Sequence, residues 1–337
     1  MSGTATGADP AERRVLVVGE ALVDLVQRAD GSRHEAPGGS PANVALTLGR
    51  LGRHPQLLTS LGDDARGLGV RTWLESSAVQ VTASAAGSTS TATAVLAWLE
   101  ASDVRVAGVG AERTSTATAL LDASGAATYE FDLAWEVDVS LAGPADVLHV
   151  GSIATVIEPG ASAVLRLVEE RRDNATITFD PNIRPALIDD AGAARARVEQ
   201  LVGLADVVKV SDEDLRWVRP DQSLSEAAAD WLALGPAAVV VTLGGEGAFA
   251  LTVAGRVSIL APLVTVVDTV GAGDTFMGAL IDGLIDADVA GADRRAALRE
   301  LPLGVLERIM RRSADAAAIT VSRPGADPPT REQLPAA

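Results

Sequence analysis

The chain alternates short apolar runs with segments whose apolar residues recur at helical spacing. The first run, VLVVGEALVDLV, follows Arg14 and is rich in β-branched residues, as expected of a buried strand. Later runs read QLLTSLG, DVLHVGS, TITFD, DVVKVSD and AVVVTLGG, with helical stretches such as ASAVLRLVEERR and SEAAADWLALG between them. This alternation over about 200 residues predicts a parallel sheet with helices on both faces.

A tandem repeat interrupts this alternation. Residues 73–97 and 98–122 are identical at 14 of 25 positions when they are aligned without gaps. Each copy is expected to form a helix end, a short strand and a Thr/Ala strand. Stacked repeats normally need at least three units to bury a continuous core, so we interpret this repeat as a local duplication. About one unit is extra, and the sequence leaves open which one.

Composition narrows the possible chemistry. The 337 residues are 47% hydrophobic but only 3% aromatic, so Ala, Val and Leu must fill one large core. The absence of cysteine excludes a disulfide framework and a thiolate nucleophile. His34, His54 and His149 are the only histidines and suggest no ligand set, so a zinc site is not expected.

The formal net charge is −17, and Lys209 is the only lysine. A chain this acidic would repel nucleic acid and anionic membranes, so neither is expected as a partner. No apolar run approaches the roughly 20 residues of a membrane span, and residues 1–13 lack the apolar core of a signal peptide. We therefore expect a cytoplasmic protein with a disordered start at residues 1–13.

The stretch DTVGAGDTF, residues 268–276, places a glycine-rich corner before a predicted helix. Unpaired backbone N–H groups there, together with the helix dipole, favour an anion. The amides belong to Gly271, Ala272, Gly273 and Asp274. A carboxylate in an anion-binding site is electrostatically unfavourable unless it has a chemical role. Accepting a proton from an attacking hydroxyl is such a role, so Asp274 is the candidate general base. The structural alternative is a helix N-cap aspartate.

Two motifs carry a family resemblance. DTVGAGDTFMGALI resembles the C-terminal signature of the PfkB/ribokinase family of carbohydrate kinases. GGSPANVA at 38–45, with Gly52 and Gly62 at matching spacing, resembles its N-terminal signature. GEALVDL, DPNIR and VKVSDEDL look more like fructokinases than ribokinases or nucleoside kinases. The resemblance runs from about residue 14 to residue 331, interrupted by the repeat.

The resemblance implies a ribokinase-like α/β fold: a doubly wound, mostly parallel sheet with helices on both faces and a small β-sheet lid. We expect one domain at 14–331, with lid segments at about 22–37 and about 88–137. The implied reaction transfers the γ-phosphoryl group of ATP to a sugar hydroxyl, with fructose to fructose 6-phosphate as the first expectation. Phosphoryl transfer asks for positioning, charge stabilisation and a weak base, which a chain without cysteine can supply. ATP, Mg²⁺ and a monovalent cation such as K⁺ are the implied cofactors.

On the sugar side, Asp24 matches the family aspartate that accepts hydrogen bonds from sugar hydroxyls. Gly38 and Gly39 would let a sugar lie against the backbone, and Asn43 can both donate and accept. Arg184, in FDPNIR at a predicted strand end, could bind substrate or a phosphate oxygen. Each residue also has a structural alternative. Asp24 could be a solvated carboxylate at a strand end, Gly38 and Gly39 could form a tight turn before a helix, and Arg184 could be a surface arginine.

On the nucleotide side, VTLGGEGAF resembles the family's T-x-G-x-x-G loop around the phosphates, through Thr242, Gly244 and Gly247. Lys209 and Ser211 lie at another strand end, in VKVSDEDL, and are also assigned to nucleotide binding. The tail AAAITVSRPGADPP is expected to flank the adenine.

Three acidic residues are candidates for the cation sites. Many family members have Asn-x-x-Glu where this chain has Ser211 and Asp214, with Glu213 between them. The sequence therefore does not decide whether Glu213 or Asp214 serves the metal ion. Mg²⁺ keeps several waters and accepts either carboxylate indirectly. An acidic helix N-terminus is the structural alternative. Asp268 resembles the acid near the family's monovalent-cation site.

Other functions compete with this hypothesis. The duplication falls in the expected lid, so a sugar-binding or regulatory protein that has lost turnover is one alternative. A kinase for 2-keto-3-deoxygluconate, ribose or a nucleoside is another. A dinucleotide oxidoreductase is disfavoured because no G-x-G-x-x-G follows the first strand. A homodimer formed through open lid edges is a further expectation.

Overall fold

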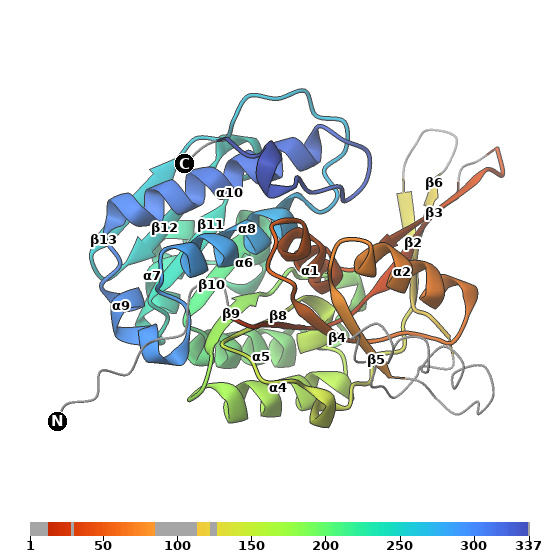
Figure 1. Cartoon of the computed structure of the whole chain (residues 1–337), viewed down its shortest axis with the longest axis horizontal. Helices are drawn as coiled ribbons and strands as arrows, with labels where there is room; N and C mark the ends of the chain where they lie inside the picture. The colour runs from red at the N-terminus through yellow and green to blue at the C-terminus, as the bar shows by residue number, and fades with distance from the viewer. Residues whose placement is uncertain (1–12, 28–29, 85–112, 122–126, 336–337) are drawn as a thin grey trace.

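The computed structural model describes residues 13–27, 30–84, 113–121 and 127–335. A nine-stranded sheet runs through the molecule in the order β13-β12-β11-β10-β9-β8-β1-β4-β5 (Figure 1). Its pairs from β5 to β11 are parallel, and β12 and β13 add an antiparallel hairpin at one edge. These strands are β1 (Val15–Val18), β4 (Gln56–Ser60), β5 (Gln80–Ser84), β8 (Val147–Gly151), β9 (Thr176–Asp180), β10 (Val207–Ser211), β11 (Ala238–Thr242), β12 (Ala248–Thr252) and β13 (Gly255–Ile259).

Helices cover both faces of this sheet, as predicted (Figure 1). Side chains alternate along a strand, so Val15 and Val17 of β1 pack with α1, α8 and α10, whereas Leu16 and Val18 pack with α4, α5 and α7. The helices are α1 (Ser40–Arg50), α2 (Ala65–Glu75), α4 (Gly160–Arg171), α5 (Ala191–Leu204), α6 (Asp212–Val218), α7 (Leu224–Ala233), α8 (Ala272–Asp286), α9 (Arg295–Arg299) and α10 (Leu303–Val321). The doubly wound architecture is thereby confirmed.

A separate four-stranded sheet, the lid sheet, stands beside the carboxyl ends of the main strands (Figure 1). Its order is β3-β2-β6-β7, with β2 parallel to β6 and the other two pairs antiparallel. The central strand β2 follows β1 after a short connection, so the lid sheet is joined directly to the main sheet. Its strands are β2 (Leu22–Gln27), β3 (Arg33–Gly38), β6 (Thr116–Leu121) and β7 (Ala127–Asp132).

The two copies of the repeat contribute different elements. The first copy supplies the end of α2 and strand β5, which pairs with β4 at the sheet edge. The second copy supplies β6, which lies between β2 and β7. The Thr/Ala strand of the first copy and the helix end and short strand of the second lie outside the described residues.

One boundary prediction was wrong. Arg13, assigned to a disordered start, is buried, and its guanidinium binds Asp293 with an N–O distance of 2.9 Å. The strand β1 begins two residues later, so this ion pair fixes the entry of the chain into the sheet. Residues 1–12 lie outside the described residues. Among the described helices, none combines the length and the apolar character needed to cross a membrane.

Candidate functional site

The candidate residues converge where the carboxyl ends of the parallel strands face the N-terminus of α8. Asp180 ends β9, Ser211 ends β10 and Thr242 ends β11. Asp24 reaches the same region from the lid strand β2, because its carboxylate lies beside Gly38, two residues before α1. Ligands of open α/β sheets bind at this edge, so the fold brings the predicted residues to the expected place.

The corner before α8 has the conformation that its glycines predict. Gly271 adopts a left-handed backbone with φ of 75°, and a Cβ atom there would lie 2.7 Å from the Cβ of Ala326. Among the described residues, the amides of Gly271, Gly273 and Asp274 find no hydrogen-bond acceptor. The amide of Ala272 is the exception to our expectation, because it donates to the carbonyl of Thr269 over 3.3 Å. Three free amides at a helix N-terminus form an anion-binding corner.

Asp274 lies in the first turn of α8 and is held from α1. The hydroxyl of Ser40 donates to its Oδ1 over 2.7 Å, and the Nδ2 amide of Asn43 donates to its Oδ2 over 2.8 Å. Asp274 as a whole is 8% exposed. Ser40 belongs to the GGSPANVA motif but was not predicted as a site residue; its spacing of three from Asn43 on a helix could have suggested a shared face.

Asn43 keeps one polar atom free. Its Nδ2 is used by Asp274, whereas its buried Oδ1 has no partner among the described residues. Buried polar atoms are normally hydrogen-bonded, so an unpaired amide oxygen beside the candidate base calls for an explanation. A ligand hydroxyl could satisfy it.

Asp24 is partly buried, and the charge of Arg184 acts on it. Burial raises the pKa of Asp24 to about 6, the charge of Arg184 opposes the rise and the charge of Asp274 adds to it. Its Oδ2 lies 2.0 Å from the position that a Cβ atom on Gly38 would occupy, so only glycine fits there. Gly39 has φ of 102° and begins α1. The guanidinium of Arg184 donates to the Oδ1 of Asn182 over 2.8 Å and remains exposed.

Lys209 is buried at the same edge and pairs with Asp180. Its Nζ lies 2.8 Å from the Oδ2 of Asp180, and the side chains are 5% and 1% exposed. Burial lowers the pKa of Lys209, but the hydrogen bond to Asp180 and the charges of Asp180, Asp274 and Asp214 together outweigh it, and the net shift is upward. Burial raises the pKa of Asp180 to about 6. Asp180 lies in the quoted FDPNIR motif, yet its pairing with a strand 29 residues away could not be read from sequence.

The two candidate metal residues in VKVSDEDL, Glu213 and Asp214, have different surroundings. Asp214 accepts a hydrogen bond from the amide of Ile183 over 3.0 Å, and burial raises its pKa. Glu213 is exposed. Ser211 caps α6, because its hydroxyl accepts from the amide of Asp214 over 3.0 Å. Among the described residues, no group of three or more His, Asp and Glu side chains is placed to hold a metal ion.

The T-x-G-x-x-G loop follows β11. The hydroxyl of Thr242 donates to the carbonyl of Val210 over 3.4 Å. Gly244 has φ of 54° and no heavy atom within 4 Å of its missing side chain. Gly247 has φ of 109°, and a Cβ atom there would lie 2.1 Å from the carbonyl oxygen of Ile259. Packing against the hairpin therefore explains Gly247, whereas Gly244 leaves open space.

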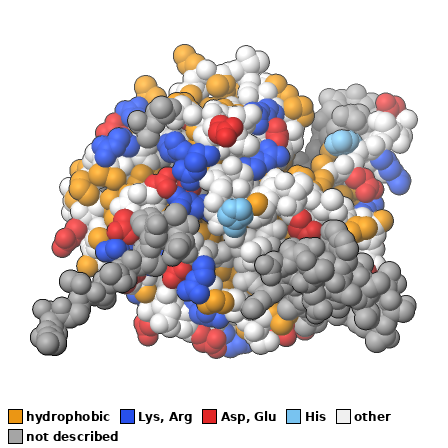
Figure 2. All heavy atoms as spheres, viewed as in Figure 1, with side chains coloured by type: hydrophobic (Ala, Val, Ile, Leu, Met, Phe, Trp, Pro, Cys, Tyr) orange, Lys and Arg blue, Asp and Glu red, His pale blue; other side chains and the backbone are white. Residues whose placement is uncertain are grey.

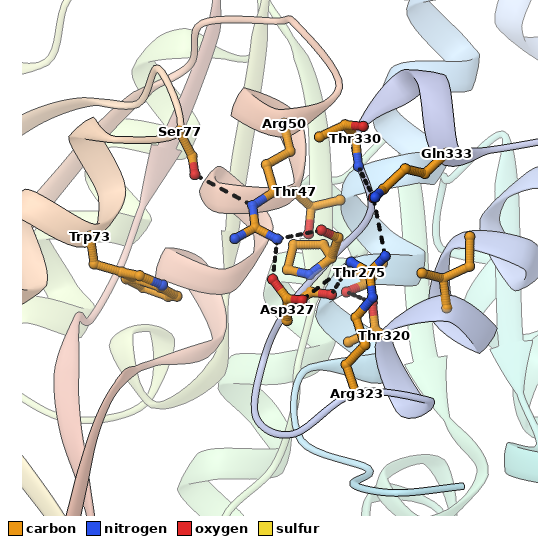
Figure 3. Close-up of polar contacts among 12 residues, drawn as sticks. Thr47, Arg50, Trp73, Ser77, Thr275, Thr320, Arg323, Asp327, Thr330 and Gln333 are labelled. Carbon is orange, nitrogen blue, oxygen red and sulfur yellow. Dashed lines mark hydrogen bonds and ion pairs between the residues drawn. The ribbon is translucent and has the colours of Figure 1, made fainter. Parts of the chain in front are cut away.

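The segment after α10 is tied to the rest of the site. Asp268 joins it to the α8 corner, because its Oδ2 accepts from the amide of Gly325 over 2.8 Å and its Oδ1 from that of Val270 over 3.0 Å. Figure 3 shows Arg50 of α1 between Ser77 and Asp327, and Arg323 between Asp327 and Gln333. These contacts hold the segment against α1. Its Ala326 lies beside Gly271 at the N-terminus of α8, and its Arg331 binds Asp286 in the last turn of that helix over 2.9 Å.

Exposed hydrophobic side chains gather in the loop between β13 and α8. Figure 2 shows hydrophobic side chains along the upper edge of the molecule, where this loop runs in Figure 1. The loop meets the tail through the amide of Val267, which donates to the carbonyl of Val321 over 2.8 Å. The exposed residues are Leu260, Leu263, Val264, Val266, Val267 and Val270.

Comparison with known proteins points to one family. The profile described as pfkB family carbohydrate kinase matches residues 12–333. A fructokinase of Rhizobium leguminosarum bv. trifolii is 32% identical over 282 residues, which are 80% of this chain and 79% of that protein. A fructokinase of Klebsiella pneumoniae is 33% identical over 80% of this chain and 84% of its own length.

Solved structures agree with this assignment. The fructokinase of Vibrio cholerae O395 in its fructose, ADP and calcium ion bound form superposes with a TM-score of 0.75 at 26% identity, over 94% of this chain and 95% of the other. The fructokinase of Xylella fastidiosa with bound ATP superposes with a TM-score of 0.77 at 23% identity, over 94% of both chains. The second likeness bears on the fold alone.

Proposed function

Because the chain belongs to the pfkB family of carbohydrate kinases, we propose that it transfers the γ-phosphoryl group of ATP to a hydroxyl of fructose and so forms fructose 6-phosphate. The observation that carries the proposal is the position of Asp274, buried at the mouth of α8 beside three free amides. Relatives named fructokinase, about 30% identical over most of the chain, support the choice of sugar.

In the proposed reaction Asp274 accepts the proton of the sugar hydroxyl. The hydroxyl oxygen forms a bond to the γ-phosphorus, and the bond from that phosphorus to the bridging oxygen of ADP breaks. Ser40 and Asn43 orient the Asp274 carboxylate, while the amides of Gly271, Gly273 and Asp274 stabilise the charge on the phosphoryl oxygens. No covalent enzyme intermediate is needed.

The sugar lies between the lid sheet and the main sheet in this proposal. The free Oδ1 of Asn43 accepts a hydrogen bond from one hydroxyl, and Asp24 accepts from others. The charge of Arg184, which acts on Asp24, favours its carboxylate form. Gly38 and Gly39 let the sugar approach the backbone.

The nucleotide lies along the edge formed by β10 and β11. Its phosphates are surrounded by Lys209, Thr242, Gly244 and Gly247. Ser211 contributes indirectly, because it caps the N-terminus of α6. The exposed loop between β13 and α8 and the segment after α10 flank the adenine.

We assign each cation to a single carboxylate near this edge. Asp214, on which the charges of Lys209 and Arg184 act, would hold Mg²⁺ indirectly, whereas the exposed Glu213 is the weaker of the two candidates. When bound, Mg²⁺ neutralises phosphate charge. Asp268, whose carboxylate joins the α8 corner to Gly325, would lie beside a monovalent cation such as K⁺.

Purified protein tests the proposal directly. ADP release is measured with ATP, Mg²⁺ and a panel of fructose, ribose, adenosine and 2-keto-3-deoxygluconate. Fructose is expected to give the highest kcat/KM. Preference for another panel member would contradict the assigned sugar, and saturable fructose binding without ADP release would favour a non-catalytic protein.

A further inference from the structure

We propose that Asp180 is a positioning residue that holds the Lys209 ammonium at the mouth of α8, where the ammonium stabilises the transferred phosphoryl group. The inference rests on the proposed kinase reaction. It gives a role to Asp180, to which the sequence analysis assigned none. Asp180 ends β9, and Lys209 lies on β10, its parallel neighbour. Their 2.8 Å contact is almost completely buried.

The ammonium touches the anion corner itself. Its Nζ lies 2.9 Å from the position that a Cβ atom on Gly273 would occupy, so it packs against the first turn of α8. The charges of Asp274 and Asp214 also act on Lys209. The only lysine of the chain therefore stands beside the amides proposed to receive the phosphoryl group, and glycine at 273 leaves room for it.

The pair is not saturated with hydrogen bonds. Among the described residues, Asp180 is the only hydrogen-bond acceptor for the ammonium, so two of its three N–H groups remain available. The Oδ1 of Asp180 is buried and has no partner there either. A buried ion pair gains little stability over apolar residues unless its remaining polar atoms are satisfied, so fold stability alone is a poor reason for this pair.

A second, partly buried ion pair shows a contact whose polar atoms are satisfied by further hydrogen bonds. Asp206 precedes β10, at the opposite end of that strand from the site, and is 2% exposed. It accepts from the guanidinium of Arg295 over 2.7 Å and from the amide of Ile177 over 2.8 Å. Arg295 also donates to the carbonyl of Ala175. This pair ties the sheet together and faces no anion corner, so it is the matched control.

Steady-state kinetics on four variants test the inference: Asp180→Asn, Lys209→Met, the double variant and Asp206→Asn. Lys209→Met should lower kcat about 10²- to 10³-fold, the usual cost of removing one charge-stabilising donor. Asp180→Asn should lower kcat about 10-fold or more while KM for the sugar stays within about twofold. The double variant, which leaves no unpaired buried charge, should match Lys209→Met, because Asp180 acts only through the lysine. Asp206→Asn should lower Tm and keep kcat.

Two results would overturn the inference while wild-type kinase activity stands. One is Asp180→Asn behaving like Asp206→Asn, with lowered Tm and unchanged kcat. The other is a double variant whose loss of kcat is the product of the two single losses, which would mean that Asp180 acts independently.

Equilibrium binding separates this inference from the proposed reaction. AMP-PCP, which carries a γ-phosphate, should lose about 10-fold or more affinity in Lys209→Met, whereas ADP should lose little. If the wild-type protein has no kinase activity but Lys209→Met still loses more affinity for AMP-PCP than for ADP, the proposed reaction is refuted and the contact of the lysine with the γ-phosphate stands. Equal losses for both nucleotides would refute the contact.

Discussion

The Nδ2 amide of Asn43 donates to the Oδ2 of Asp274 over 2.8 Å, across 231 residues of sequence. This one contact joins the first turn of α1 to the first turn of α8, and so joins the two motifs that carry the family resemblance. Ser40 makes the companion contact to Oδ1. The candidate base is therefore fixed in place by the helix that also borders the sugar site.

Removing the hydroxyl of Ser40 should slow turnover without abolishing it. Ser40→Ala removes a hydrogen bond to a charged group, worth about 1.5–3 kcal/mol, so kcat should fall roughly 10- to 10²-fold if the contact persists in the transition state. KM for ATP should change little. An unchanged kcat, measured by ADP release, would show that Ser40 does not orient the base.

Gly38→Ala should weaken sugar binding through Asp24. The added methyl group would lie 2.0 Å from the Oδ2 of Asp24 and must displace that carboxylate. The loss of hydrogen bonds to a charged group predicts a rise in KM for fructose of roughly 10- to 10²-fold. Gly69→Ala is the control, because nothing lies within 4 Å of its missing side chain. Equal KM values for both variants would contradict the assignment of Asp24.

Glu20 should make the protein less stable as pH rises. Burial raises its pKa from 4.5 to about 7, so the folded protein binds this proton more tightly than the unfolded chain does. The resulting stability is fully present below pH 4.5 and is lost as pH rises through about 7, at most about 3 kcal/mol. Glu20→Gln should remove this part of the dependence.

Urea denaturation at pH 4.5 and pH 8 measures the effect of Glu20. The exposed Glu213→Gln serves as the control and should keep the wild-type difference between the two pH values. Asp24 and Asp180, whose pKa values burial also raises, act in the same direction and remain in both variants. A Glu20→Gln variant with the full wild-type difference would contradict the prediction.

Two deletions of 25 residues should differ in stability although each leaves one copy of the repeat. Deleting 85–109 keeps every described residue. Deleting 73–97 rebuilds β5 from the second copy, with alanine in place of Thr82 and glycine in place of Ala83. It loses the hydrogen bond that Thr82 accepts from Gln56 over 2.8 Å and a buried methyl group, so it should be less stable by about 1–3 kcal/mol.

Thermal denaturation and ADP release compare the two deletions. The protein without 85–109 should keep its activity, because the helix α2 and the strands β5 and β6 retain their residues. Loss of stability and activity in that variant would show that the extra unit is integrated into the fold.

Sequence patterns predicted the sheet, its helices and the glycine corner before α8, because buried strands and glycine corners depend on local residues. The partners of Asp180 and Ser40 escaped prediction, since strand order and side-chain direction decide which distant residues touch. Arg13 was missed for the same reason: its partner Asp293 lies 280 residues away. Two copies that share 14 of 25 residues also do not reveal which one supplies β5 and which β6.

The central claim is that Asp274 removes a proton from fructose while free amides hold the phosphoryl group. ADP release by wild type and by Asp274→Asn, with ATP, Mg²⁺ and fructose, tests it most directly. The account predicts fructose-dependent ADP release by wild type and a kcat lowered about 10²- to 10⁴-fold in a variant of unchanged Tm. A folded Asp274→Asn protein that turns over as fast as wild type would contradict it.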